Sequence, residues 1–379
     1  MKGVVKERWN SFLGEECPFP SKTFRKINSY EVQTVICTEK KIFLLDNHGT
    51  ILQEKSLKTI LKKQDNITTP PTIIKQKETI SCVFGTKKGH IVSFNLETGE
   101  QEWNNMVERS IQGTIEYDPK DQELLATTEK TIHRLTLQGK IKKTVELEEI
   151  NTANAIFFDN KILLSTDQGA CLLTKKGEIY WKYPTKNKIS VRPLVIKERK
   201  PHLLICSDEG TIHYLDHNGE KQWDFSLEGP TLHKPLLYMS LEQEERILCT
   251  STTNKLHAID KETGSECWSL MTDFWINTQP IVEKRDEISI AIVGTVDGKI
   301  YCIDIDEKLE TTFFPGLQNV LDQGITYNSS LSKDISKEKA EIIFTKEVGS
   351  QIINIEHLSH QNSILCLTRT GQVINFKIN

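Results

Sequence analysis

The sequence predicts an all-β fold: an eight-bladed β-propeller of four-stranded antiparallel blades, with seven blades as the alternative. Three observations predict it. Related text recurs at a period of about 40 residues, which is typical of repeat architectures. A tryptophan follows a turn glycine by four residues in four of these repeats. Short segments between the turns alternate apolar and polar residues, which favours strands. The four repeated tryptophans are Trp103, Trp181, Trp223 and Trp268.

Each repeat contains four strand signals in a constant order. A proline precedes a short apolar run, and a turn and a second apolar run follow. A small-residue corner then leads to an alternating segment, a glycine turn and the tryptophan segment. Glycine or asparagine supplies the positive φ that tight hairpin turns require. We therefore expect one four-stranded blade per repeat, with the proline ahead of its first strand.

The third strands of the blades can be counted along the chain. Eight segments fit: 41–46, 90–96, 131–136, 170–174, 211–216, 255–260, 299–304 and 372–378. The third blade has Lys143 where other blades have tryptophan, and the last blade is one strand short. The segment 4–12 contains Trp9 and can supply the missing strand. An open ring would leave unpaired strand edges, which invite aggregation. We therefore expect the N-terminal strand to close the ring.

Length and spacing favour one propeller domain over residues 1–379, with a closing strand at 1–13 and insertions at 53–71 and 316–350. Leu57, Ile60 and Leu61 have helical spacing among lysines in the first insertion. This insertion is either a solvated loop that packs one face on a blade edge or a docking helix. The second is long and charged, and long loops tend to be either functional or disordered. Both alternatives remain open from the sequence.

Two segments carry a resemblance to a known family. TKKGHIVSFNLETGEQEW at 86–103 and SDEGTIHYLDHNGEKQW at 207–223 resemble the quinoprotein-type (PQQ-like) propeller motif, and the resemblance extends over essentially the whole chain. The family includes quinone-dependent alcohol dehydrogenases, the BamB-type scaffold lipoprotein and the C-terminal propeller of an acyl-adenylating enzyme. The resemblance implies that each outer-strand tryptophan docks against the next blade. These structural residues are Trp9, Trp103, Trp181, Trp223 and Trp268, of which the last three should be mostly buried.

Composition limits the partners and the compartment. The net charge is −4 and the pI is 6.2, so the sequence shows no electrostatic footprint for nucleic acid or an anionic membrane. No segment has the apolar length of a membrane span or the pattern of a secretory signal. The nine cysteines include no CxxC pair, which argues against a zinc site or a disulfide framework. We expect a cytoplasmic, monomeric ring, or a fragment of a longer protein.

No catalytic motif stands out. HExxH, GxSxG and GxxxxGK[ST] are absent from the sequence, and its acidic residues show no grouping like a calcium cage. We therefore predict no catalytic, cofactor-binding or metal-binding residues and no cofactor. The leading hypothesis is a non-catalytic scaffold for a protein partner. The alternatives are a module that binds a small ligand or a quinone cofactor, and the propeller subunit of a larger enzyme assembly.

The residues just before the repeat prolines form the one candidate binding site. The first strand of each blade lines the central channel, so Arg192, Lys234 and Gln279 should occupy equivalent positions near one mouth. His233 and Asn277 extend this candidate patch. Two positive groups and an amide would suit an acidic peptide or a carboxylate ligand. The alternative is that these side chains bond neighbouring backbone groups or face water.

Overall fold

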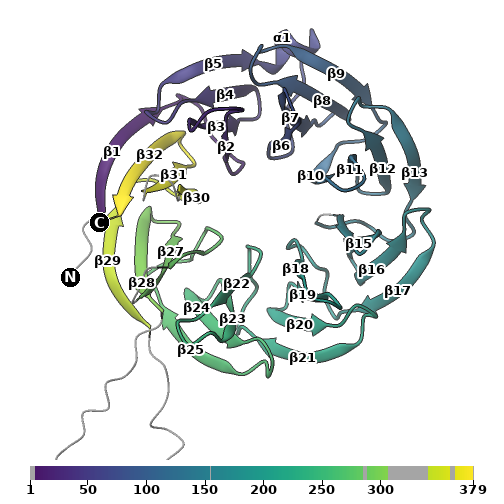
Figure 1. The fold of residues 1–379 in the computed structure, drawn as a ribbon. Helices are drawn as coiled ribbons and strands as arrows, with labels where there is room; N and C mark the ends of the chain where they lie inside the picture. The colour runs from purple at the N-terminus through teal and green to yellow at the C-terminus, as the bar shows by residue number, and fades with distance from the viewer. Residues whose placement is uncertain (1–4, 154, 285–287, 306–339, 359–362, 379) are drawn as a thin grey trace, which may run out of the picture.

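Short antiparallel strands pair into eight separate four-stranded sheets that stand around an open centre (Figure 1). The computed structural model describes residues 5–153, 155–284, 288–305, 340–358 and 363–378. Seven sheets use four strands in chain order, and the eighth has the order β1-β32-β31-β30. The prediction of an eight-bladed propeller is therefore confirmed, and the seven-bladed alternative is excluded.

The four strands of each blade run from the channel to the rim. The inner strands are β2 (Lys22–Arg25), β6 (Thr72–Lys75), β10 (Gln112–Asp118), β14 (Ile156–Phe158), β18 (Leu194–Ile196), β22 (Leu236–Met239), β26 (Ile281–Lys284) and β30 (Ile352–Leu358). The second strands are β3 (Val32–Cys37), β7 (Ile80–Gly85), β11 (Glu123–Thr127), β15 (Lys161–Thr166), β19 (His202–Cys206), β23 (Glu245–Thr250), β27 (Ser289–Gly294) and β31 (Ser363–Thr368). The third strands are β4 (Lys41–Leu45), β8 (His90–Asn95), β12 (Thr131–Thr136), β16 (Gly169–Thr174), β20 (Thr211–Leu215), β24 (Lys255–Asp260), β28 (Lys299–Asp304) and β32 (Gln372–Ile378). The outer strands are β5 (Ile51–Ser56), β9 (Gln101–Met106), β13 (Ile141–Glu146), β17 (Ile179–Pro184), β21 (Lys221–Ser226), β25 (Glu266–Met271), β29 (Glu341–Glu347) and β1 (Val5–Phe12).

Burial explains the residue pattern of the strands. The second and third strands lie between neighbouring blades, so both of their faces are covered; all six residues of β7 and of β27 are buried. An outer strand has one covered face, and β9, β17 and β21 accordingly alternate between exposed and half-buried residues. The apolar runs and the alternating segments therefore follow from position in the blade.

The N-terminal strand closes the ring, as predicted. β1 pairs antiparallel with β32, from Val5 opposite Ile378 to Phe12 opposite Gln372. The two ends of the chain therefore share blade 8 (Figure 1). The pairing covers the edge that β32 would otherwise expose to other chains.

Part of each predicted insertion belongs to a blade strand instead. Residues 53–56 of the first belong to β5, the outer strand of blade 1. Residues 341–347 of the second form β29, the outer strand of blade 7. Within that strand, Phe344 pairs with Cys302 at the register position that tryptophan occupies in other blades. Residues 316–339 lie outside the described residues.

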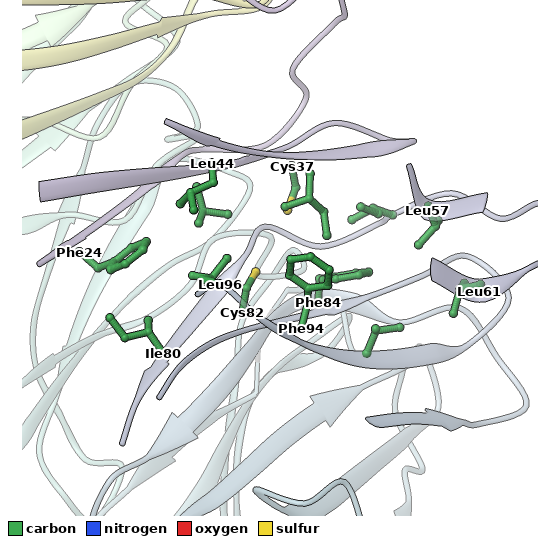
Figure 2. Packing of buried hydrophobic residues seen from close by; sticks show 14 residues of the cluster. Phe24, Cys37, Leu44, Leu57, Leu61, Ile80, Cys82, Phe84, Phe94 and Leu96 are labelled. Atoms are coloured by element: carbon green, nitrogen blue, oxygen red, sulfur yellow. The ribbon is translucent and has the colours of Figure 1, made fainter. Parts of the chain in front are cut away.

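The helical spacing in the first insertion corresponds to a short helix, α1 (Leu57–Leu61). Leu57 and Leu61 are buried, and Ile60 is half-buried against the same apolar cluster. This cluster fills the space between blades 1 and 2, where Cys37 and Phe84 also lie (Figure 2). The apolar side of the helix therefore extends the core of the protein itself. Within the described residues, no helix has the length and apolar character needed to cross a membrane.

Candidate functional site

In four blades, an outer-strand tryptophan donates a hydrogen bond to the next blade. The indole Nε1 of Trp223 donates a hydrogen bond of 2.9 Å to the carbonyl of Lys261 in blade 6. The others donate in the same way: Trp9 to Asn47 at 2.9 Å, Trp103 to Leu137 at 2.7 Å, and Trp181 to His217 at 3.2 Å. Each acceptor lies in the hairpin between the third and outer strands of the next blade. These four tryptophans are half-buried, whereas Trp268 is 5% exposed.

A glycine in each receiving hairpin makes room for the indole. Gly264 has φ +70°, and a Cβ at this position would lie 2.6 Å from the Trp223 ring. Gly49, Gly139 and Gly219 meet the indoles of blades 8, 2 and 4 in the same way. Two physical reasons therefore require glycine at this position: the backbone is left-handed, and the indole ring approaches too closely for a side chain. The spacing between glycine and tryptophan reflects contacts between successive blades.

Blades without tryptophan use other side chains at the same contact. In blade 1, Gln53 donates from Nε2 to the carbonyl of Leu96 at 3.1 Å. In blade 3, Lys143 is exposed, and Val145 packs against Gly177 instead. The contact between blades is thus retained where the tryptophan signal is lost.

The candidate channel-mouth residues are held by a different kind of contact. Arg192 stands two residues ahead of β18 in blade 5, and its Nη2 donates to Oε2 of Glu116 at 2.8 Å. Glu116 lies on β10 in blade 3, and blade 4 stands between these two blades. An ion pair between non-adjacent blades has to pass in front of the inner edge of blade 4. It therefore lies on the side of the inner strands that faces the axis of the ring (Figure 1).

Lys234 and Lys22 belong to the same charge cluster. Burial lowers the pKa of Lys234; the positive charges of Arg192 and Lys22 lower it further, while Glu116 raises it. Burial also raises the pKa of Glu116, and the charges of Arg192, Lys234 and Lys22 oppose that shift. The channel mouth thus combines three cations from blades 1, 5 and 6 with a mostly buried carboxylate from blade 3.

The other three predicted site residues take different positions. Burial lowers the pKa of His233 to about 4, against a hydrogen bond with the backbone of Asn277 that raises it. Asn277 donates from Nδ2 to the carbonyl of Ile352 in blade 8 at 2.8 Å. These two residues therefore join the loops of successive blades 6, 7 and 8. Gln279 is half-buried beside Pro280.

Sequence reasoning missed Glu116 and Lys22. The repeat prolines were the signal for residues at the channel mouth, and the first strand of blade 3 has no proline before it. Pairing with the second strand supplies the missing signal. Glu116 pairs with Leu125 and Lys22 with Val35, each three residues before the threonine at the blade corner. Counting back from the corner would have placed both residues on the channel.

Exposed apolar side chains gather in the loops on the same side of the ring. The loops that lead from an outer strand to the next inner strand all emerge on one face, because every blade has the same strand order. Leu232 (51% exposed), Phe274 (49%) and Trp275 (52%) lie in two such loops. Lys234 lies in the same loop as Leu232. This face, the loop face, therefore carries both the cationic channel mouth and the exposed aromatic residues.

Three cavities elsewhere in the ring share no lining residue with the channel cluster. One of about 100 Å³ lies between blades 3 and 4, beside Gly177 and Lys182. Within the described residues, no group of three or more His, Cys, Asp or Glu side chains is placed to hold a metal ion. The charge cluster at the channel mouth is therefore the arrangement we consider as a binding site.

A family model described as outer membrane protein assembly factor BamB matches residues 208–309. No curated protein sequence matches the chain.

Solved structures resemble the whole ring. BamB from Moraxella catarrhalis has a TM-score of 0.69 at 15% identity, covering 99% of this chain and 98% of its own. The computationally designed Ika8 protein also has a TM-score of 0.69, at 13% identity, with 98% of this chain and 100% of its own covered. BBS1N, solved in complex with ARL6DN, has a TM-score of 0.57 at 12% identity and covers 100% of this chain and 98% of its own. The chain therefore shares the propeller fold of these structures over its whole length, and residues 208–309 match the BamB family model.

Proposed function

We propose that the protein is a non-catalytic interaction scaffold that binds a protein partner through its loop face. The observation that carries the proposal is the loop 272–280, which displays Phe274 and Trp275 about half exposed on the same face as the channel mouth. Large apolar side chains that remain exposed together mark interaction sites more often than single ones do. Tryptophan is also among the residues that contribute most to binding energy.

The backbone of this loop is tied down before any partner arrives. Thr272 donates from Oγ1 to the carbonyl of Phe274 at 2.8 Å, and the amide of Val296 donates to the carbonyl of Trp275 at 3.0 Å. Asp273 also accepts from Lys299 at 2.9 Å and from Tyr301 at 3.0 Å. A loop ordered in advance loses little entropy on association, which favours affinity.

Similar propellers support the proposal by their names. One is described as an assembly factor, and another was solved in complex with a second protein. These descriptions concern those proteins, and their fold is what this chain shares. We also propose a cytoplasmic location: eight of the nine cysteines are buried, as expected for thiols that serve as small apolar core residues in a reducing compartment.

Quantitative co-purification tests the scaffold proposal. The tagged protein is compared with a Phe274→Ser/Trp275→Ser variant, and with a control in which Ile179 and Tyr180, exposed on an outer strand, become serine. We expect one protein to co-purify at stoichiometric yield with the wild type and the control, and to be lost with the loop variant. Equal recovery with all three proteins, or a monomer with measurable turnover and no partner, would contradict the proposal.

A further inference from the structure

The charged residues of the channel mouth lie at two neighbouring levels of the ring, two residues apart along the inner strands. Lys22, Glu116 and Glu356 occupy equivalent inner-strand positions, because each pairs with the second-strand residue three before the blade corner. Arg192 and Lys234 each lie two residues ahead of that position in blades 5 and 6. Side chains from five blades therefore meet around the same part of the channel.

Positive charge exceeds negative charge among these five side chains. Glu356 is already engaged: its carboxylate accepts from Ser21 at 2.7 Å, from the amide and hydroxyl of Thr23 at 2.9 and 2.6 Å, and from Asn354 at 3.0 Å. Glu116 remains as the carboxylate that faces Arg192, Lys234 and Lys22 together. Three cations therefore face two carboxylates, of which only Glu116 lies among all three cations.

Hydrogen-bond donors also remain unmatched. Arg192 uses Nη2 on Glu116, while its buried Nε–H has no acceptor among the described residues. Oε1 of Glu116 is a buried acceptor without a donor there, so it does not serve the Nε–H of Arg192. Burial of a cation without an acceptor costs free energy, and the lowered pKa of Lys234 reports that cost. A bound anion would supply the missing acceptors.

We propose that the channel mouth binds a carboxylate between Lys22, Arg192 and Lys234, and that the carboxylate belongs to an acidic segment of the protein partner. The inference rests on the scaffold function proposed above. The exposed aromatic residues of the same face would hold the body of the partner, and its acidic segment would enter the channel. Charge complementarity therefore selects an acidic segment over a neutral or basic one.

Binding of a fluorescent hexaglutamate peptide, followed by anisotropy at low salt, tests the inference directly. Hexaglutamine is the matched peptide without charge, and succinate is the free dicarboxylate. We expect saturable binding of hexaglutamate that weakens with salt, and no binding of hexaglutamine. Binding of succinate alone, or equal binding of the two peptides, would overturn the assignment to an acidic segment.

Two substitutions should have opposite effects. Lys234→Met removes one charge-assisted hydrogen bond and should weaken hexaglutamate binding roughly tenfold. Glu116→Gln removes the competing carboxylate, keeps an acceptor for Arg192 and offers an amide donor, so binding should strengthen. A merely structural role for the cluster would not give changes of opposite sign.

The control substitution is Lys75→Met. Lys75 ends inner strand β6, and Arg25, at the end of β2, lowers its pKa in addition to burial. It lies three residues, about 10 Å along the strand, from the level of Lys22. We expect Lys75→Met to bind hexaglutamate as tightly as the wild type does. A loss as large as that of Lys234→Met would show general attraction to the basic channel and overturn the site. Because Lys234→Met removes a poorly solvated cation, its melting temperature should not fall.

The co-purification assay separates this inference from the scaffold proposal. If the partner is lost with Phe274→Ser/Trp275→Ser but retained in full with Lys22→Met/Lys234→Met, the scaffold stands and the channel inference fails. If hexaglutamate binds with the expected pattern while no protein co-purifies, the channel site stands and the scaffold proposal fails. Loss of the partner with both variants supports both.

Discussion

At the scale of single residues, the tryptophan and the glycine of successive blades act as a pair. The indole of Trp223 stacks on Tyr214 of its own blade, with ring centroids 4.8 Å apart, and donates to Lys261 of the next. Gly264 admits this ring only because it has no side chain. The pair explains why both residue types recur with one spacing in the sequence.

Replacing Gly264 should cost more stability than replacing a glycine of similar backbone geometry in open space. Gly264→Ala places alanine in a left-handed backbone conformation, which costs about 1–2 kcal/mol of stability. Its Cβ also clashes with Trp223, which costs about 1–3 kcal/mol more. Gly349 has φ +82°, and a Cβ added there would meet no atom within 4 Å, so Gly349→Ala should carry only the first cost. Urea unfolding of both variants measures the difference, and equal losses would contradict the docking role.

His233 should make the stability of the ring depend on pH. The pKa of His233 is about 4 in the folded protein, against about 6.5 in an unfolded chain. Protonation therefore favours the unfolded state, so the stability that His233 contributes is complete above pH 6.5 and declines as the pH falls toward 4. Between pH 7 and pH 5, the wild type should lose about 2 kcal/mol more than His233→Gln. Urea unfolding at both pH values measures this, and parallel losses would disprove it.

At the scale of secondary structure elements, most strands follow from local pattern. The eight third strands could be located from the sequence because their residues alternate and because turn residues flank each segment. The outer strand of blade 7 could not, because a long segment separates β28 from β29, and because Phe344 replaces tryptophan. Helix α1 could be anticipated from its spacing, but the choice between solvent and a packed core depended on the neighbouring blade.

The buried face of α1 should matter far more than its exposed face. Leu57 is 1% exposed within the cluster between blades 1 and 2 (Figure 2). Leu57→Ala should therefore destabilise the protein by about 2–5 kcal/mol. Lys58→Ala, at the next and exposed position, should change stability by less than about 0.5 kcal/mol. Urea unfolding of the two variants decides whether the helix belongs to the core; equal small effects would show that it does not.

At the scale of the whole molecule, the ring brings together residues that no local pattern connects. The sequence repeats indicated that Arg192 and Lys234 share a channel mouth. Glu116 reaches Arg192 across blade 4, and Lys22 approaches from blade 1. Such contacts depend on the number of blades and on closure, so they could be predicted only once the register of every blade was known. The exposed aromatic loop was missed for a different reason. The sequence alone does not show whether aromatic residues such as Phe274 and Trp275 are buried in the core or exposed.

Closure itself can be tested by removing β1. Deleting residues 2–12 would remove the pairing with β32, the hydrogen bond from Trp9 to Asn47 and the packing of Trp9 on Gly49. Blade 8 would then expose an unpaired strand edge, and the contact between blades 8 and 1 would weaken. We expect a lower melting temperature and aggregation detectable by light scattering. A control that lacks only residues 2–4 keeps the whole of β1 and should behave as the full chain does. An unchanged melting temperature after the longer deletion would show that the ring stays closed through the core packing of blades 8 and 1 alone.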